Sequence, residues 1–170
     1  MDEAYRICPY LLVLDQGKAT AEGPRVAIFS NPPTLATARM MGCQNLSGIR
    51  IHTDGVVEAL DWGCGLQIPL AKIREGASHL GIYSNHIRLA GNSDNVNIME
   101  CRLFNIIESP HHVTINAKLT KTGHEACLKI VWPKEKWRHL GLQKEQLLKI
   151  QLPPDKIFLT KDEQAKQRSL

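Results

Sequence analysis

The sequence predicts a mainly β fold built from small antiparallel barrels, and two observations indicate it. Short apolar segments that alternate with polar residues recur from about residue 45 onward, and clusters of Gly, Pro, Asn and Asp separate them. Few segments show helical periodicity, so hairpin-connected strands are expected rather than the alternating strands and helices of a parallel sheet.

The first 44 residues predict a small unit of helices and one hairpin. Pro9 stops the first helix, and Gly17 supplies the positive φ that the hairpin turn needs. Thr34 is placed to cap the N-terminus of the last helix, and Gly42 to end it. The expected elements are a helix over 2–8, strands over 10–14 and 19–22, a helical turn over 25–29 and a helix over 35–41.

Strands dominate the rest of the chain. In the clearest of them, Val113, Ile115, Ala117 and Leu119 share one face, which is the period of a half-buried strand. The expected strands cover residues 49–51, 56–62, 66–70, 80–89, 98–107, 113–119, 128–132, 148–152 and 157–159, with one short helix over 133–140.

Residues 49–89 and 97–159 predict two related halves. Each ends in an alternating strand, a polar break and a short apolar strand. We expect short apolar strands such as 98–107 to leave sheet edges that a second copy covers, and so we expect a homodimer.

Charge is concentrated toward the C-terminus. Residues 99–170 contain thirteen Lys and Arg against eight Asp and Glu, although the whole chain carries only +4. A basic OB-fold module that binds nucleic acid is therefore an alternative function. Aromatic residues make up only 5% of the chain, which argues against a base-stacking surface and against a nucleic-acid partner.

Metal and catalytic motifs are missing from the sequence. Five scattered cysteines form no C-x-x-C pair, so we expect reduced thiols in a cytoplasmic protein and no metal site. There is no phosphate loop, no G-x-S-x-G and no H-E-x-x-H. We therefore expect no ATP site, no other cofactor and no catalytic residues. We expect a protein that is not an enzyme.

The N-terminal motifs nevertheless have a familiar order. The runs Asp2-Glu-Ala4, Leu11-Leu-Val-Leu-Asp-Gln-Gly-Lys18, Asn31-Pro32 and Ala38-Arg-Met-Met-Gly42 closely resemble the segment just after the switch histidine of ABC importer ATPase subunits. The resemblance implies that residues 1–44 are the C-terminal part of an ATPase domain. The Walker A, Walker B and signature motifs and the switch histidine would then precede this chain.

The following residues resemble the TOBE, or molybdate-binding-protein-like, regulatory domain of these subunits. Residues 42–48 look like that family's S-A-R-N-x-L-x-G opening, with Gly42 for Ser and Gln44 for Arg, and residues 83–89 look like its I-K-A-S-x-V-x-L strand. The resemblance implies an OB-like β-barrel domain over 45–160, with a flexible tail over 161–170. Within that family, the chain resembles the subunits of molybdate and sulfate importers.

A regulatory, dimerising domain of an importer ATPase is the function that this resemblance implies. Its partners would be transmembrane permease subunits at the cytoplasmic face of the inner membrane, and its ligand molybdate, tungstate or sulfate. Neutral amide and hydroxyl donors suit such an oxyanion. The candidate ligand residues are Asn45, Ser47, Ser84, Asn85 and Ser109, with His111 or Lys118 as a positive charge.

Overall fold

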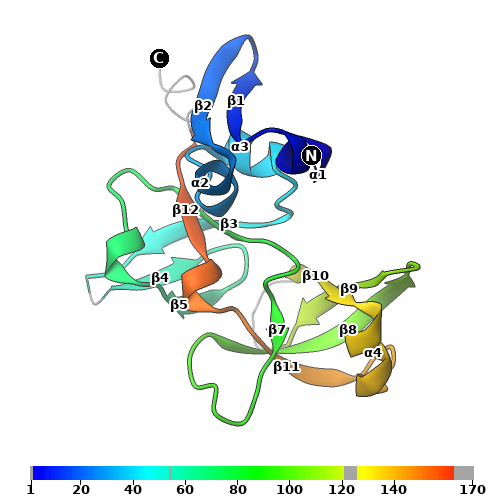
Figure 1. Cartoon of the computed structure of the whole chain (residues 1–170). Coiled ribbons are helices and arrows are strands. Elements are labelled where there is room, and N and C mark those ends of the chain that lie inside the picture. The colour runs from blue at the N-terminus through cyan, green and yellow to red at the C-terminus, as the bar shows by residue number, and fades with distance from the viewer. Residues whose placement is uncertain (1, 54, 121–125, 163–170) are drawn as a thin grey trace.

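Residues 2–53, 55–120 and 126–162 are described by the computed structural model, and antiparallel strands dominate them (Figure 1). Two five-stranded sheets follow a small N-terminal body, which we define as residues 2–42. The part of the tail from residue 163 onward lies outside the described residues.

The N-terminal body has the elements that the sequence predicts. They are α1 (Asp2–Ile7), β1 (Tyr10–Asp15), β2 (Lys18–Pro24), α2 (Arg25–Ser30) and α3 (Leu35–Met40). Thr34 caps α3, since its hydroxyl accepts a hydrogen bond from the amide of Thr37 at 3.1 Å. Gly17 and Gly42 adopt φ of 76° and 86°, so the hairpin turn and the helix end use the glycines expected for them.

The first sheet has the strand order β12-β6-β3-β4-β5. Its strands are β3 (Asn45–Ile51), β4 (Val56–Ala59), β5 (Cys64–Gln67), β6 (His79–Ile82) and β12 (Phe158–Thr160). The strand expected over 66–70 ends at Gln67, because Pro69 starts the 3₁₀ turn η1 (Leu70–Lys72).

The second sheet has the strand order β7-β11-β8-β9-β10. In it β8, β9, β10 and β11 take the places that β3, β4, β5 and β6 have in the first sheet, and β7 takes the place of β12, so the two orders are equivalent. Its strands are β7 (Arg88–Leu89), β8 (Ile98–Glu108), β9 (His112–Leu119), β10 (Cys127–Pro133) and β11 (Leu147–Gln151). The helix α4 (Lys134–Leu140) follows β10, and the 3₁₀ turn η2 (Pro154–Lys156) precedes β12. The prediction of two related halves is therefore confirmed.

The two halves exchange their last strands. β7 follows β6 in the chain but pairs with β11 of the second half, and β12 pairs with β6 of the first half. The single strand expected over 80–89 is wrong, because a turn in which His86 donates to the Tyr83 carbonyl at 2.9 Å redirects the chain between β6 and β7. The expectation that 98–107 is a sheet edge is also wrong at Cys101 and Arg102, which pair with β9 on one side and with β11 on the other.

Side chains from the opposite half hold each exchanged strand. The Trp132 indole donates to the carbonyl of Ile87, just before β7, at 2.7 Å. Lys72 Nζ donates to the carbonyl of Ile157, just before β12, at 2.9 Å. Each half thus supplies a donor to the other half at an equivalent position.

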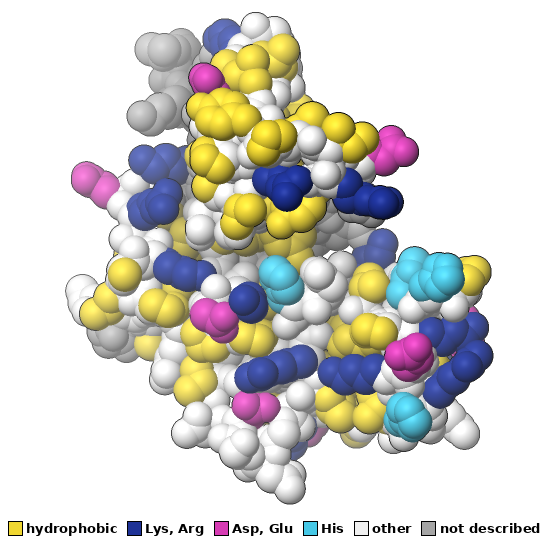
Figure 2. Space-filling view, viewed as in Figure 1, with side chains coloured by type: hydrophobic (Ala, Val, Ile, Leu, Met, Phe, Trp, Pro, Cys, Tyr) yellow, Lys and Arg dark blue, Asp and Glu magenta, His cyan; other side chains and the backbone are white. Residues whose placement is uncertain are grey.

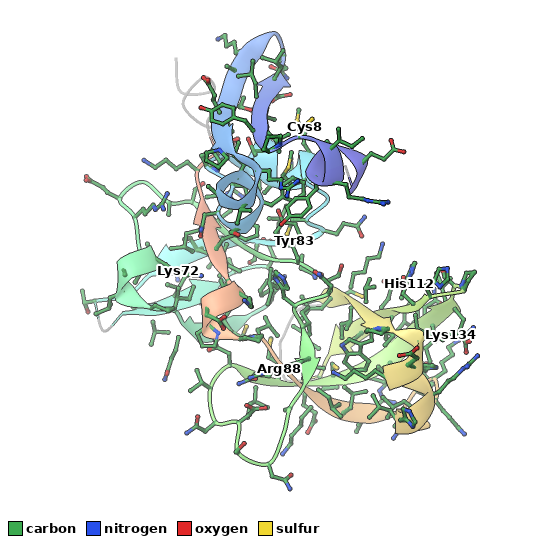
Figure 3. The ribbon with its side chains drawn as sticks, viewed as in Figure 1. Cys8, Lys72, Tyr83, Arg88, His112 and Lys134 are labelled. Carbon is green, nitrogen blue, oxygen red and sulfur yellow. The ribbon has the colours of Figure 1, made fainter. Side chains whose placement is uncertain are left out.

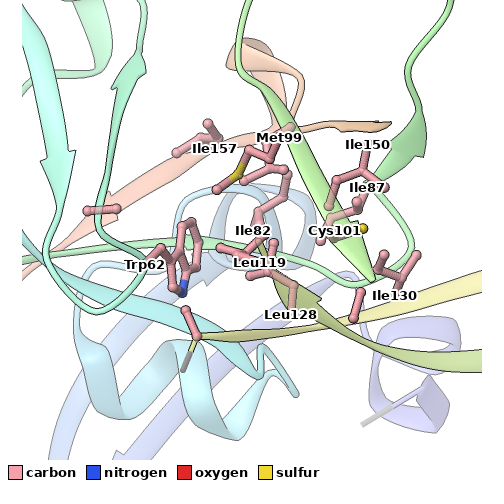
Figure 4. Packing of buried hydrophobic residues seen from close by; sticks show 14 of the residues in the cluster. Trp62, Ile82, Ile87, Met99, Cys101, Leu119, Leu128, Ile130, Ile150 and Ile157 are labelled. Atoms are coloured by element: carbon pink, nitrogen blue, oxygen red, sulfur yellow. The ribbon is translucent and has the colours of Figure 1, made fainter. Parts of the chain in front are cut away.

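One hydrophobic core runs through both sheets. Trp62 and Ile82 from the first half pack in the same cluster as Leu119, Leu128 and Ile130 from the second half (Figure 4). The N-terminal body packs against β12 through a smaller, separate cluster of Ala38, Cys43 and Phe158. Because Phe158 belongs to β12, the exchanged strand also anchors the N-terminal body.

Candidate functional site

Asn45 begins β3 and covers the free edge of β10. Its Oδ1 accepts from the amide of Lys129 at 2.7 Å, and its Nδ2 donates to the Lys129 carbonyl at 2.8 Å and to the Ile82 carbonyl at 3.3 Å. The side chain therefore bonds both backbone groups of Lys129, as a neighbouring strand would, and connects the two halves. Both amide hydrogens already have protein acceptors, so Asn45 links the start of β3 to β10 and β6.

The buried thiol of Cys43 supports the same start of β3. Its Sγ donates to the carbonyls of Asn45 and Ile82, each at 3.5 Å. Burial raises the pKa of Cys43 to about 12 despite these hydrogen bonds. The thiol is therefore uncharged near neutral pH and adds no negative charge that would repel an anion.

Ser84 reaches the same edge of β10 as Asn45. Its carbonyl accepts from the amide of Val131 at 3.0 Å, two residues along the strand from Lys129. Among the described residues, the Ser84 hydroxyl and the Asn85 amide group have no hydrogen-bond partner, and Asn85 is exposed. The structure thus brings Asn45, Ser84 and Asn85 together and leaves two neutral side-chain donors free.

Ser47 has a structural position in the first sheet. Its buried Oγ donates to the Gly48 carbonyl and accepts from the amide of Asp61, both at 2.9 Å. Asp61 Oδ2 in turn accepts from the Gly48 amide at 2.7 Å. These contacts tie the segment after β4 to β3.

The remaining candidates lie elsewhere in the second half. Ser109 and His111 belong to the turn between β8 and β9, and the carbonyl of His111 accepts from the Lys134 amide at 3.0 Å. About 13 Å of extended strand separates Lys129 from the end of β10 that lies next to this turn. The Lys118 ammonium lies 4.7 Å from the ring centroid of Phe104 on β8, on the far side of β9 from β10.

Asn97 is a counterpart of Asn45 that sequence reasoning missed. Its Oδ1 accepts from the Gln67 amide at 2.8 Å, and its Nδ2 donates to the carbonyls of Gln67 at 2.9 Å and Leu152 at 3.2 Å. Gln67 lies on the edge strand β5, so each half covers the other's edge with one asparagine. The sequence signal that could have identified Asn97 is its position, because it comes immediately before β8, the first strand of its half.

The described ranges contain neither a metal-binding cluster nor a helix that could span a membrane. No group of three or more His, Cys, Asp and Glu lies close enough to hold a metal ion there. No helix in these ranges is long and apolar enough to cross a membrane.

Comparison with known proteins identifies the fold. No family model matches the chain, and a search of curated proteins finds no match. Among solved structures, the chain is similar to the cytoplasmic molybdate-binding protein ModG with molybdate bound, with a TM-score of 0.53 at 10% sequence identity. The match covers 69% of this chain and 96% of ModG. The chain therefore has a mainly β, OB-like fold of the kind seen in ModG.

Proposed function

We propose that this chain is a non-catalytic regulatory domain of an ABC importer ATP-binding subunit and binds a tetrahedral oxyanion such as molybdate. The observation that carries the proposal is the fold, which matches nearly the whole of a molybdate-binding protein. Because the protein with the similar fold binds molybdate, the alternative function of nucleic-acid binding is not favoured. We expect no ATP hydrolysis by this chain alone.

The surface of the N-terminal body supports the importer context. Tyr10, Leu12 and Leu14 alternate along β1 and are 57%, 57% and 58% exposed, so one face of the hairpin is apolar and uncovered. Contiguous exposed apolar side chains are typical of surfaces that pack against another protein. We propose that the ATPase body covers this face, at the cytoplasmic side of the membrane that holds the permease subunits.

The oxyanion would bind beside Asn45, at the start of β3. Ser84 and Asn85 supply uncommitted hydroxyl and amide donors there, and Asn45 fixes the adjoining backbone. Hydrogen bonds to a charged acceptor contribute about 1.5–3 kcal/mol each, so the two side chains together contribute about 3–6 kcal/mol before ordering costs.

Thermal melting with molybdate, tungstate and sulfate at millimolar concentration tests this proposal. A rise in melting temperature with at least one anion is expected, and Ser84→Ala together with Asn85→Ala should remove most of it. Ser93→Ala together with Asn92→Ala, in an exposed loop, is the matched control and should keep the full shift. No shift with any anion would show that the oxyanion proposal is wrong.

A further inference from the structure

A cleft of about 770 Å³ opens where the N-terminal body meets the turn between β6 and β7. Figure 3 shows Tyr83 at this junction, and Figure 2 shows apolar and basic side chains around it. The volume lies within the range of about 300–1,000 Å³ that is typical of small-molecule sites. The cleft is therefore large enough for an organic ligand.

Aromatic rings form much of the cleft wall. Tyr5 and Phe29 are in edge-to-face contact with ring centroids 4.7 Å apart, and Tyr83 and His86 are in similar contact at 5.8 Å. The buried thioether of Met41 adds a polarisable surface. Such walls favour a flat aromatic body over a compact inorganic ion.

The charge of the cleft is positive. Arg6 is the one Lys, Arg, Asp or Glu among its described lining residues, and its guanidinium has no ion-pair or hydrogen-bond partner in the described part of the chain. The nearby Arg25 is already committed, because it donates to the Tyr5 carbonyl and lies 5.0 Å from the Tyr5 ring centroid. Arg6 is thus free to pair with an acidic group on a ligand.

Polar groups without partners lie at the same place. Tyr83 Oη and His86 Nδ1 are buried and have no hydrogen-bond partner among the described residues. Burial, with the charge of Lys156, lowers the pKa of His86, so the ring is neutral at pH 7 and adds no second cation. The exposed amide group of Asn85 adds a donor at the rim.

We propose that this cleft binds a small planar organic anion, with an aromatic ring among Tyr5, Phe29 and Tyr83 and an acidic group on Arg6. This site shares Asn85 at its rim with the oxyanion proposal but differs from it, because the ring and the acidic group are held by residues of α1 and α2 and by Tyr83, and no tetrahedral ion is needed. A ligand here contacts both the N-terminal body and the β6–β7 turn, so its binding strengthens their association.

Four probes separate the contributions of ring and charge. Benzoate has both, benzamide has the ring without the charge, acetate has the charge without the ring, and cyclohexanecarboxylate has the charge on a non-planar ring. Titrations followed by ¹H–¹⁵N NMR should show saturable benzoate shifts at 28–31, 41–43 and 83–86. Benzamide and acetate should bind about tenfold more weakly or worse, with cyclohexanecarboxylate between them and benzoate.

Two charge variants test the location. Arg6→Gln should weaken benzoate binding about tenfold while leaving benzamide unchanged, and Ser30→Asp should also weaken benzoate by placing a negative charge on the lining. Arg74→Gln and Ser93→Asp make the same changes at exposed positions away from the cleft and should have no effect. The amide spectrum of each variant also shows whether it is folded, so a loss of binding through unfolding is recognised directly.

The proposal is overturned if benzoate gives no saturable shift at the cleft, or if Arg6→Gln and Arg74→Gln bind it equally well. A benzamide affinity equal to that of benzoate would also overturn it, since the anion would then be irrelevant. Molybdate added to benzoate-saturated protein should not displace benzoate. Displacement would place both anions at one site and overturn the assignment of a separate one.

Discussion

Asn45 and Asn97 satisfy backbone groups that no strand of the described residues reaches. Each side chain bonds both the N–H and the C=O of one edge residue, Lys129 on β10 and Gln67 on β5. An unpaired strand edge invites pairing with other chains, and an amide side chain covers it without adding a strand. Asparagine suits this role because it has an acceptor and two donors on a short stem.

Asn45→Ala and Asn97→Ala should each lower the free energy of unfolding by about 1–3 kcal/mol, because partly buried backbone groups lose their partners. Urea denaturation measures the loss, and Asn92→Ala in an exposed loop is the control. A neutral result for both variants would contradict the structural role. A loss of anion binding without a loss of stability would instead make Asn45 a direct ligand.

Gly81 is required by a close approach between β6 and β12. A Cβ at this position would lie 2.5 Å from Phe158 Cζ and 2.8 Å from Leu46 Cδ2. Gly81→Ala should therefore destabilise the protein by about 1–3 kcal/mol through overpacking. In the double variant with Phe158→Leu, part of this loss should be recovered, measured as a non-additive free energy of unfolding. Gly91→Ala, with no neighbour closer than 3.4 Å, is the control and should be near neutral.

At the element scale, the outer end of β8 is a partly free edge. β11 pairs with β8 only as far as Arg102, and its neighbours Glu145 and Gln146 reach Leu103. Beyond it, residues 105–108 pair with β9 on one side, and Phe104 lies at an irregularity in that pairing. Phe104 and Ile107 are 46% and 52% exposed. We propose that a second copy pairs here.

Ile107→Lys should convert a dimer to a monomer, because a charge on an apolar edge opposes strand pairing. Light scattering at high protein concentration measures the change from twice the 19.0 kDa chain mass to that mass. Leu70→Lys places the same charge at another exposed apolar residue and should leave the dimer intact. Wild-type protein that stays monomeric would show that the homodimer proposal is wrong.

At the scale of the whole molecule, strand exchange makes the two halves depend on each other. Neither sheet is complete without a strand from the other half, and one core spans both. Two independent barrels would instead each have their own core and unfold separately. The exchange thus predicts a single cooperative unit.

Native-state hydrogen exchange tests this cooperativity. The slowest amides of β6 and β11 should report the same free energy of opening, since opening one sheet removes a strand from the other. A difference of more than about 2 kcal/mol between the two sheets would show that the halves open independently. Spectra recorded for intact protein suffice, because both sheets are observed in one sample.

The sequence determined the local structure of this protein. Thr34, Gly17 and Gly42 act as their residue types predict, and alternation such as that of 113–119 marks the buried face of each strand. Alternation could not show which strands pair, because backbone hydrogen bonds are the same for every residue type. Only the tertiary structure therefore decided that β7 and β12 change places. The same limit applies to the site: folding brought Asn45 to Ser84 and Asn85 and left Ser109, His111 and Lys118 elsewhere, because those distances depend on pairing across the exchanged halves.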